Sequence, residues 1–295
     1  MQMLGQEASQ RLPVRRHPHR LDYIGAALLV AASGSMAFAL GDKSAEARTV
    51  LGLLTLSMLL WAMFVRRLGR ADEPFIPLSV LRNATARNET LCGSFALGAF
   101  MGLNFLMPIY FERALGMPAD RAGLALIPLM IGTVIGATLS GRMMGRLQQY
   151  KAPALVGVGL AFTASLLLTS RAGQLSLAPL DLLLCCISIG VGAILPVSTV
   201  CVQNAVETRH LGSATSEMLF VRQISSALVV ALLGSVVMGG GALLSEPSQL
   251  APHALDDLAA SFRGVFAATS VCFALSLLFL LLVEEKPLRS TPGAG

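Results

Sequence analysis

Apolar stretches of about 16 to 24 residues alternate along this chain with short polar segments. A membrane-spanning α-helix needs about 20 consecutive apolar residues, because each residue adds about 1.5 Å to its length. The pattern therefore predicts an all-α membrane protein with eight transmembrane helices. They are expected at 23–40, 50–65, 91–111, 122–140, 153–170, 178–200, 214–237 and 264–283. An even number of spans places both termini on the same side of the membrane.

The distribution of the 22 basic residues indicates which side that is. Cytoplasmic loops carry an excess of Lys and Arg, and one set of alternate loops holds most of them here. That set comprises Arg11, Arg15, Arg16, Arg20, Arg66, Arg67, Arg70, Arg82, Arg87, Arg142, Arg146, Lys151, Arg209, Lys286 and Arg289. The opposite loops hold Lys43, Arg48, Arg113, Arg121, Arg171 and Arg263. We therefore expect a cytoplasmic leader at 1–22, a cytoplasmic loop at 67–88 and a cytoplasmic tail at 285–295.

Composition adds little beyond this arrangement. With 54% hydrophobic residues and a mean hydropathy of +0.69, no stretch is long and polar enough for a separate soluble domain. The net charge of +5 lies in loops that flank apolar segments, which argues against nucleic-acid binding. The basic leader followed by Ala37-Phe38-Ala39 also matches a cleaved secretory signal. The apolar run continues to Leu40, however, which favours an uncleaved first span.

The residues typical of an enzyme or a metal site are absent from the expected spans. The four histidines lie in loops or tails, and the sequence has no His-Glu-x-x-His, Gly-x-Ser-x-Gly or phosphate-binding Gly-x-x-x-x-Gly-Lys motif. The five cysteines lie within the spans, where Cys acts as a small apolar residue. Asn83-Ala84-Thr85 and Asn88-Glu89-Thr90 match the glycosylation pattern by chance, since they fall in the expected cytoplasmic loop. We expect no enzyme activity, cofactor or metal.

A transporter needs helices that pack closely, breaks in those helices and a few polar groups facing a shared cavity. Small residues recur at four-residue spacing in two expected spans, and the sixth span is interrupted by residues that disfavour a regular helix. The packing candidates are Gly98, Gly102, Gly132 and Gly136, and the interruptions are Gly190, Gly192 and Pro196. Tight helix packing without motion explains each of these sites equally well.

Arg222 is the most costly residue within a span. An arginine at the centre of a membrane helix costs about 2.5 to 3.5 kcal/mol on insertion scales, so it needs a partner or a wet cavity. At helical spacing, Thr215, Ser225 and Ser226 share its side of the helix. Three roles remain open: a place in the transport pathway or its coupling, a structural tie to carbonyls of a neighbouring helix, or snorkelling to the interface.

Three other polar residues are candidates for the pathway. Asn104 lies within the third span and Glu112 at its outer end, where an interfacial carboxylate in water is the simpler interpretation. Glu217 lies near the cytoplasmic entrance of the seventh span and is expected to be solvated or paired with a loop arginine. Five residues correspond to about 140° around a helix that has 3.6 residues per turn, so Glu217 and Arg222 do not pair within their own helix.

The segment Met107-Pro108-Ile109-Tyr110-Phe111-Glu112-Arg113, continuing to Pro128, resembles the fourteen-helix drug:proton antiporters of the major facilitator superfamily. Three further segments agree in order and spacing. They are Leu21-Asp22-Tyr23-Ile24-Gly25, Glu73-Pro74-Phe75 with the following Leu81-Arg82-Asn83, and Gly212-Ser213-Ala214-Thr215 through Val221-Arg222-Gln223-Ile224. The last resembles the family's thirteenth helix, where an Arg-Gln pair is typical, so Gln223 joins the pathway candidates.

This resemblance implies the C-terminal portion of such an antiporter, helices seven to fourteen. Residues 23–66 would form the family's two extra central helices, and 89–284 its C-terminal six-helix bundle. Helices one to six, with the family's proton-coupling acid, have no counterpart here. The implied function is proton-coupled efflux of small amphipathic molecules across a bacterial inner membrane. Family members rock one six-helix bundle against the other around a midplane site.

One motif departs from the family pattern. Gly141-Arg142-Met143-Met144-Gly145-Arg146 resembles the family's cytoplasmic gating loop, but Gly145 stands where an Asp is expected. Without that Asp the latch is in doubt, and Arg142 and Arg146 also fit simple topology charges.

The implied partners are the lipid bilayer, a small amphipathic substrate with protons, and a separate N-terminal transporter half. Two alternatives to transport remain, an inert truncated remnant and an interaction partner that docks on another transporter half. Homodimerisation into a pseudo-complete transporter is a third arrangement.

Overall fold

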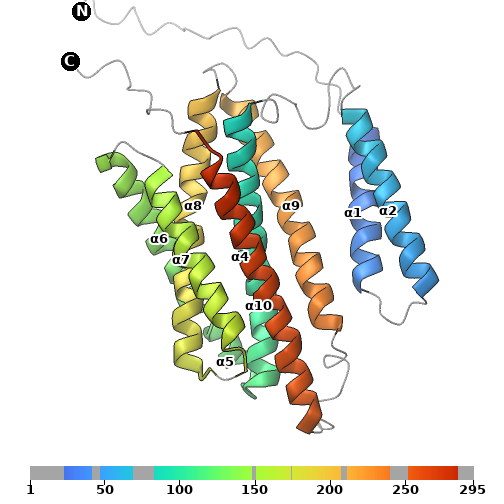
Figure 1. Ribbon diagram of the computed structural model, residues 1–295, viewed down its shortest axis with the longest axis vertical. Coiled ribbons are helices and arrows are strands. Elements are labelled where there is room, and N and C mark those ends of the chain that lie inside the picture. The colour runs from blue at the N-terminus through green and yellow to red at the C-terminus, as the bar shows by residue number, and fades with distance from the viewer. Residues whose placement is uncertain are drawn as a thin grey trace, which may run out of the picture.

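The computed structural model describes residues 23–41, 47–68, 83–147, 151–173, 175–206, 211–239 and 252–284. Every regular element in these ranges is a helix, as Figure 1 shows. The helices are α1 (Tyr23–Gly41), α2 (Ala47–Leu68), α4 (Ala84–Ala114), α5 (Ala119–Leu124), α6 (Ile127–Leu147), α7 (Lys151–Ser170), α8 (Leu177–Ala205), α9 (Leu211–Gly239) and α10 (Pro252–Leu281). The predicted all-α fold class is confirmed.

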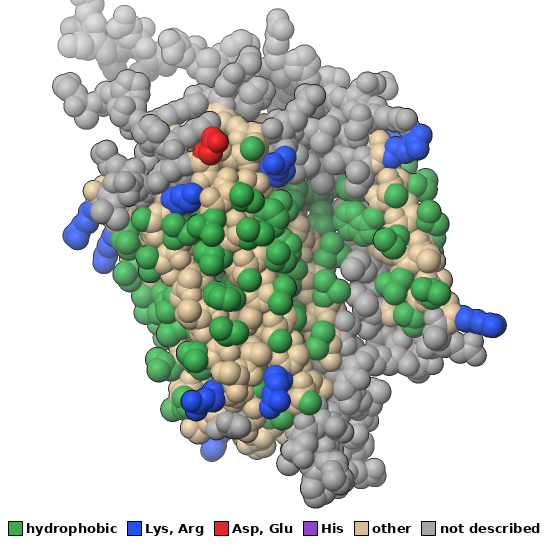
Figure 2. Space-filling view, viewed as in Figure 1, with side chains coloured by type: hydrophobic (Ala, Val, Ile, Leu, Met, Phe, Trp, Pro, Cys, Tyr) green, Lys and Arg blue, Asp and Glu red, His purple; other side chains and the backbone are tan. Residues whose placement is uncertain are grey.

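Seven of the eight predicted spans fall on one long helix each, and the fourth, 122–140, covers the end of α5 and most of α6. Six segments of the described chain are long and apolar enough to cross a membrane: Ala84–Ala114, Ala119–Arg146, Lys151–Ser170, Leu177–Ala205, Leu211–Gly234 and Leu258–Leu281. Arg48–Phe64 is apolar but shorter. Figure 2 shows apolar side chains over the middle of the visible face, with Lys and Arg toward its two ends. This distribution fits a bilayer, while the number of eight crossings stays a prediction.

The helix that carries the third span begins earlier than the hydrophobicity pattern predicts. Asn83 is the N-cap of α4, and its side-chain oxygen accepts hydrogen bonds from the backbone N–H groups of Thr85 and Ala86 at 3.0 and 3.2 Å. Its amide also donates to the carbonyl of Ala205 at 3.0 Å. Residues 84–88, expected in a cytoplasmic loop, are therefore the first turns of α4.

The fourth predicted span, 122–140, is interrupted. The short helix α5 ends at Leu124, and α6 starts at Ile127. Pro128 explains the break because it has no N–H to donate to the carbonyl four residues earlier, and its ring clashes there. At its other end α6 continues to Leu147, so the residues predicted as a gating turn, 141–146, are helical.

Six long helices form one bundle, in which α4 and α8 are the inner members. α4 packs against α8, α9 and α10, while α8 packs against α6 and α7. Most of α4 is buried, whereas most of α6 is exposed. The exposed face of α6 is apolar and includes Met130, Ile131 and Val134, as expected of a surface toward lipid or another apolar partner.

Glycines allow the closest helix approaches in this bundle. A Cβ added to Gly136 of α6 would meet the backbone of Ile189 of α8, with the carbonyl carbon at 2.8 Å. Gly192 of α8 faces the backbone of Thr133 of α6 in the same way. Between α7 and α8, a Cβ on Gly157 would lie 2.8 Å from the carbonyl oxygen of Gly190. These helices meet backbone to backbone, which only residues without a side chain permit.

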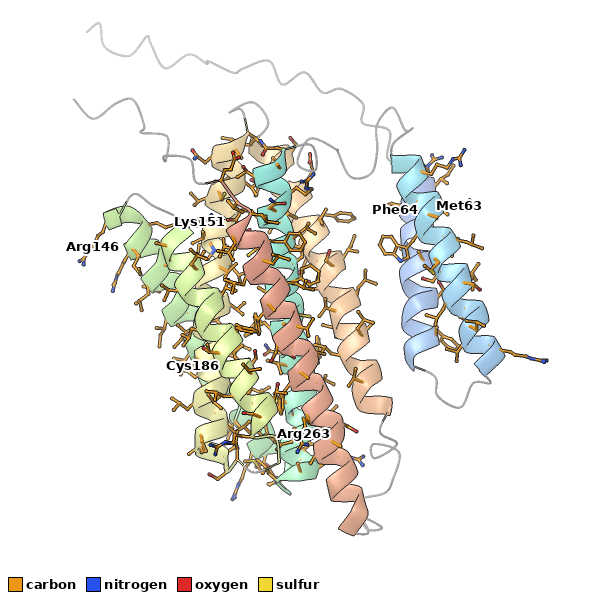
Figure 3. The ribbon with its side chains drawn as sticks, in the orientation of Figure 1. Met63, Phe64, Arg146, Lys151, Cys186 and Arg263 are labelled. Atoms are coloured by element: carbon orange, nitrogen blue, oxygen red, sulfur yellow. The ribbon has the colours of Figure 1, made fainter. Side chains whose placement is uncertain are left out.

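The α1–α2 pair lies beside α9. Within the pair, the Ser57 hydroxyl donates to the carbonyl of Ala32 at 2.8 Å. Phe64 of α2 is buried and packs with Phe220 and Ile224 of α9. Figure 3 shows Phe64 on the side of α2 that faces the bundle, and Met63, which is exposed, pointing elsewhere.

The end of α10 is held by a lysine from the start of α7. The Lys151 ammonium donates to the carbonyls of Leu281 and Val283 at 3.2 and 2.6 Å. Asn88 of α4 donates to the carbonyl of Leu282 at 3.2 Å. These carbonyls have no partner within the helix, so a cation and an amide satisfy them.

Replacement of Gly136 by alanine tests the backbone contact between α6 and α8. We expect Gly136→Ala to lower the free energy of unfolding by about 1 to 3 kcal/mol, because the new methyl group meets the Ile189 backbone. Gly141→Ala is the matched control, since a Cβ there has no neighbour within 4 Å. It should leave stability unchanged or raise it by up to about 1 kcal/mol. Denaturant titration in detergent micelles measures both, and equal effects would contradict the contact.

Candidate functional site

The first turns of α4 bring polar side chains into the bundle. Thr85, Asn88, Glu89 and Cys92 recur at spacings of three and four residues and are all buried. Their spacing puts them along one side of the helix. The side chain of Ser276 on α10 donates to the carbonyl of Cys92 at 2.9 Å and lies 3.2 Å from its sulfur. This end of α4 is thus enclosed by neighbouring helices and not by solvent.

Glu89 is the acidic residue of this stripe. Its side chain is 1% exposed, and neither carboxylate oxygen has a hydrogen-bond partner among the described residues. The carboxyl group faces the Ser198 hydroxyl and the Cys201 thiol of α8. Ser198 gives its hydrogen to the backbone oxygen of Glu89, at 3.0 Å, and not to the carboxylate.

Arg222 of α9 is the second buried charge. Its side chain is 8% exposed, and Nε and Nη1 have no hydrogen-bond partner among the described residues. The Ser226 hydroxyl donates to the Arg222 carbonyl at 2.6 Å, which occupies its backbone but not its guanidinium. The side chain runs toward α4 and α8, so it does not snorkel to a helix end, and no described carbonyl ties down Nε or Nη1.

Gly93 gives Arg222 the room to lie there. A Cβ on Gly93 would be 3.2 Å from Cδ of Arg222 and 3.3 Å from Oγ of Ser198. Gly93 follows Glu89 by one helical turn on the same side of α4. We call Glu89, Gly93, Ser198 and Arg222 the buried charged cluster. Its residues come from α4, α8 and α9. It contains one acidic and one basic side chain, and polar atoms of both lack a hydrogen-bond partner among the described residues.

Glu217 is also enclosed by the bundle. It is 5% exposed, because α9 turns this side toward its neighbours. Of the two expectations for Glu217, solvation is therefore wrong, and pairing with a loop arginine stays a prediction. Nearby on the same helix, Thr215 accepts a hydrogen bond from the side chain of Gln203 of α8 at 3.2 Å. These contacts fix the start of α9 to the end of α8.

The remaining pathway candidates do not join the cluster. Asn104 is half-buried, and its amide donates to the carbonyl of Phe100, one turn back on its own helix, at 3.0 Å. Glu112 is exposed near the far end of α4, which fits the interfacial interpretation. Gln223 is exposed, unlike its neighbour Arg222.

The predicted packing glycines lie at helix contacts. Cβ atoms on Gly98 and Gly102 of α4 would meet Val229 and Leu233 of α9, the first at 2.7 Å. A Cβ on Gly132 of α6 would lie 2.8 Å from the Cys185 carbonyl oxygen of α8. Gly136 makes the contact with Ile189 described above.

The predicted gating residues have open surroundings. A Cβ on Gly141 or Gly145 would meet nothing within 4 Å, and Arg142 and Arg146 are exposed. Figure 3 shows Arg146 pointing away from the bundle at the end of α6. No described residue holds these side chains in a latch, which fits the interpretation of Arg142 and Arg146 as topology charges.

Sequence reasoning missed Glu89 because it was assigned to the edge of a cytoplasmic loop. The signal that identifies it is the N-cap Asn83, which starts the helix before the apolar run and places Glu89 on its second turn. The same structure gives Asn83 and Asn88 roles as a helix cap and a donor to α10, which accounts for both without glycosylation.

The chain belongs to the major facilitator superfamily, since the model of that superfamily matches residues 21–230. It is 26% identical over 257 residues to the multidrug transporter protein MdtP of Bacillus subtilis (strain 168), covering 85% of this chain and 46% of that protein. It is 27% identical over 229 residues to a tetracycline resistance determinant of Streptomyces rimosus, covering 74% of this chain and 64% of that protein. The family consists of transporters and not of enzymes.

A solved structure shows the same fold. It is that of a bacterial homologue of the human lysosomal transporter Spinster in an inward-facing, occupied conformation, with a TM-score of 0.56 at 17% identity. The match covers 88% of this chain and 64% of that chain. The chain spans about half the length of the curated relatives it matches.

Arg222→Met tests whether the buried arginine serves stability. Replacing a buried, incompletely paired charge by an apolar side chain of similar length removes its desolvation cost. We expect the free energy of unfolding to stay equal or to rise by about 1 to 4 kcal/mol, measured by denaturant titration in detergent. Arg222→Lys should give no such gain, since it keeps the charge. A large loss of stability in Arg222→Met would instead show that the guanidinium holds the helices together.

Proposed function

We propose that this chain is the C-terminal part of a proton-coupled exporter of small amphipathic molecules. It resides in a bacterial inner membrane with both termini in the cytoplasm. The observation that carries the proposal is Arg222, a charge buried between three spanning helices with two nitrogens unpaired. Ionisable residues inside membrane helices are costly and rare, and they commonly mark substrate, ion or proton pathways.

The relatives support the export role. The names of MdtP and of multidrug resistance protein 3 of Bacillus subtilis describe multidrug transport or resistance, and that of the Streptomyces protein describes tetracycline resistance. Superfamily membership supplies the transport mechanism, in which two bundles rock around a site between them. An ion gradient is the energy source, because the sequence has no phosphate-binding loop for a nucleotide.

The domain division follows from the same proposal. Residues 89–284 form the six-helix bundle, extended at its start by the first turns of α4, and 23–66 form the two extra helices. Met130, Ile131 and Val134, on the exposed apolar face of α6, would meet lipid or an N-terminal half. Arg222 and Gln223 are the first pathway residues, with Asn104, Glu112 and Glu217 as further candidates.

Transport by the assembled protein is the test. Inverted membrane vesicles holding this chain with an N-terminal six-helix half should accumulate a fluorescent amphipathic cation when the vesicle interior is acidified. Collapse of the pH gradient with a protonophore should abolish accumulation. Vesicles that hold the chain and the half together, and that never accumulate drug, would support the remnant or the interaction partner. Accumulation by this chain alone would support the homodimer.

In that assay, Arg222→Ala should reduce accumulation at least tenfold, because the cluster loses its base, while the amount of protein in the membrane stays unchanged. Arg263→Gln is the matched control, since Arg263 is exposed near the other end of the bundle, as Figure 3 shows. Its accumulation should remain normal. If Arg222→Ala transports as well as the parent, the arginine is not part of the pathway.

A further inference from the structure

The proposed function assigns no role to Glu89, the most deeply buried acidic or basic residue among the described residues. Glu89 is more completely buried than Arg222, and both of its carboxylate oxygens lack a hydrogen-bond partner among the described residues. An ionised carboxylate in such a place costs far more than a neutral acid, so the group takes up a proton instead. The packed bundle therefore favours the carboxylic acid form of Glu89.

The hydroxyl groups nearby are committed to other acceptors. Ser198 donates to the Glu89 backbone oxygen, Thr90 to the Ala86 carbonyl at 2.7 Å and Ser94 to the Thr90 carbonyl at 2.7 Å. None of these hydrogens is aimed at the Glu89 carboxylate. Ser198 still has lone pairs on its oxygen, so it can accept a hydrogen bond from a protonated carboxyl group. With these hydroxyl hydrogens used elsewhere, the Cys201 thiol is the remaining described donor that faces the carboxyl group, and a thiol is a weak donor.

The charged and titratable groups around Glu89 come from several helices. Cys201 of α8, Cys92 of α4 itself and Lys151 at the start of α7 act on Glu89 directly. Arg222 of α9 lies against Gly93, one turn further along α4, and Glu217 is buried on the same helix as Arg222. Glu284, just after the end of α10, is exposed. The Lys151 ammonium donates to carbonyls at the end of α10, whereas Nε and Nη1 of the Arg222 guanidinium have no partner among the described residues.

We propose that Glu89 is a proton-binding site of this transporter and that Arg222 is the counter-charge that stabilises Glu89 after the proton leaves. The inference rests on the proposed function and assigns its coupling ion to a residue. The step is a simple protonation equilibrium, in which a carboxylate oxygen gains or loses one proton and no other bond changes.

The position of Glu89 along α4 indicates the side of the membrane toward which its proton is released. It lies on the second turn of α4, about 8 Å from the start of that helix at 1.5 Å per residue. That end of α4 is the one expected in the cytoplasm. When the contact between α4 and α8 opens there, water reaches the carboxyl group and the proton leaves toward the cytoplasm. The anion then attracts the guanidinium of Arg222, whose side chain lies against Gly93, one helical turn after Glu89 on α4.

Infrared difference spectroscopy of this chain in lipid nanodiscs tests the protonation directly. The spectrum of the parent minus that of Glu89→Gln at pH 7 should contain the C=O stretch of a protonated carboxyl group. Glu112→Gln is the matched control on the same helix, because Glu112 is exposed and should show the carboxylate stretch instead. If Glu89→Gln removes a carboxylate band, Glu89 is ionised in the packed bundle and the proposal is wrong.

Glu89→Met provides a second variant, of similar length and without polar atoms, should the glutamine variant fail to fold. Helical circular dichroism checks folding for both. The same band should disappear in Glu89→Met, and it should be retained in Glu217→Gln. If the band is lost in Glu217→Gln and persists in both Glu89 variants, the proton is carried by Glu217 and not by Glu89, and the proposal is overturned.

Vesicle assays of the assembled transporter then test coupling. Glu89→Gln is permanently neutral, so it should still exchange labelled for unlabelled drug at near the parent rate. Its accumulation of drug against a gradient should fall at least tenfold. Loss of both exchange and accumulation, or normal accumulation, would overturn the coupling role.

The two proposals fail in different ways. If the parent transporter exchanges and accumulates no drug, the export function fails, and the infrared band still decides whether Glu89 binds a proton. If the parent accumulates drug by a pH gradient and Glu89→Gln does so equally, export stands and the assignment of Glu89 falls.

Discussion

The close approach of helix backbones is the constraint on which the rest of this bundle depends. In a lipid solvent the hydrophobic effect does not drive one apolar helix onto another, so van der Waals contact and hydrogen bonds must hold them together. Gly136 and Gly192 allow α6 and α8 to meet at the backbone, and Gly157 and Gly190 do the same for α7 and α8. Larger residues at these positions would separate the helices.

The second constraint is that polar groups inside the bundle must find partners within the protein. Most of the buried hydroxyl groups donate a hydrogen bond to a carbonyl one turn back on their own helix, as Thr90, Ser94 and Thr269 do. Ser198 and Ser276 instead donate across to α4. These bonds satisfy the hydroxyls and align the helices at low cost.

Glu89 and Arg222 are exceptions, because polar atoms of both side chains have no hydrogen-bond partner among the described residues. Their positions follow from the close packing of the helices. Arg222 can lie against α4 only because Gly93 has no side chain, and Glu89 is shut off because α8 and α10 cover the same end of α4. The carboxyl group and the guanidinium both keep unpaired polar atoms, and the positions on α4 that they belong to or contact, Glu89 and Gly93, are one helical turn apart. Tight packing thus keeps both groups away from the water that would otherwise solvate them.

The sequence by itself determined the helices and their membrane character, because both depend on local properties. The length of an apolar run predicts a spanning helix from neighbouring residues alone. The free-energy cost of placing Arg222 in the membrane is likewise evident from its position in such a run, whichever helices surround it. The burial of Glu89, the enclosure of Glu217 and the open surroundings of Arg142 and Arg146 were decided only by the tertiary structure. Each depends on helices far away in the chain, such as α8 covering α4, and hydrophobic periodicity carries no information about which helices become neighbours.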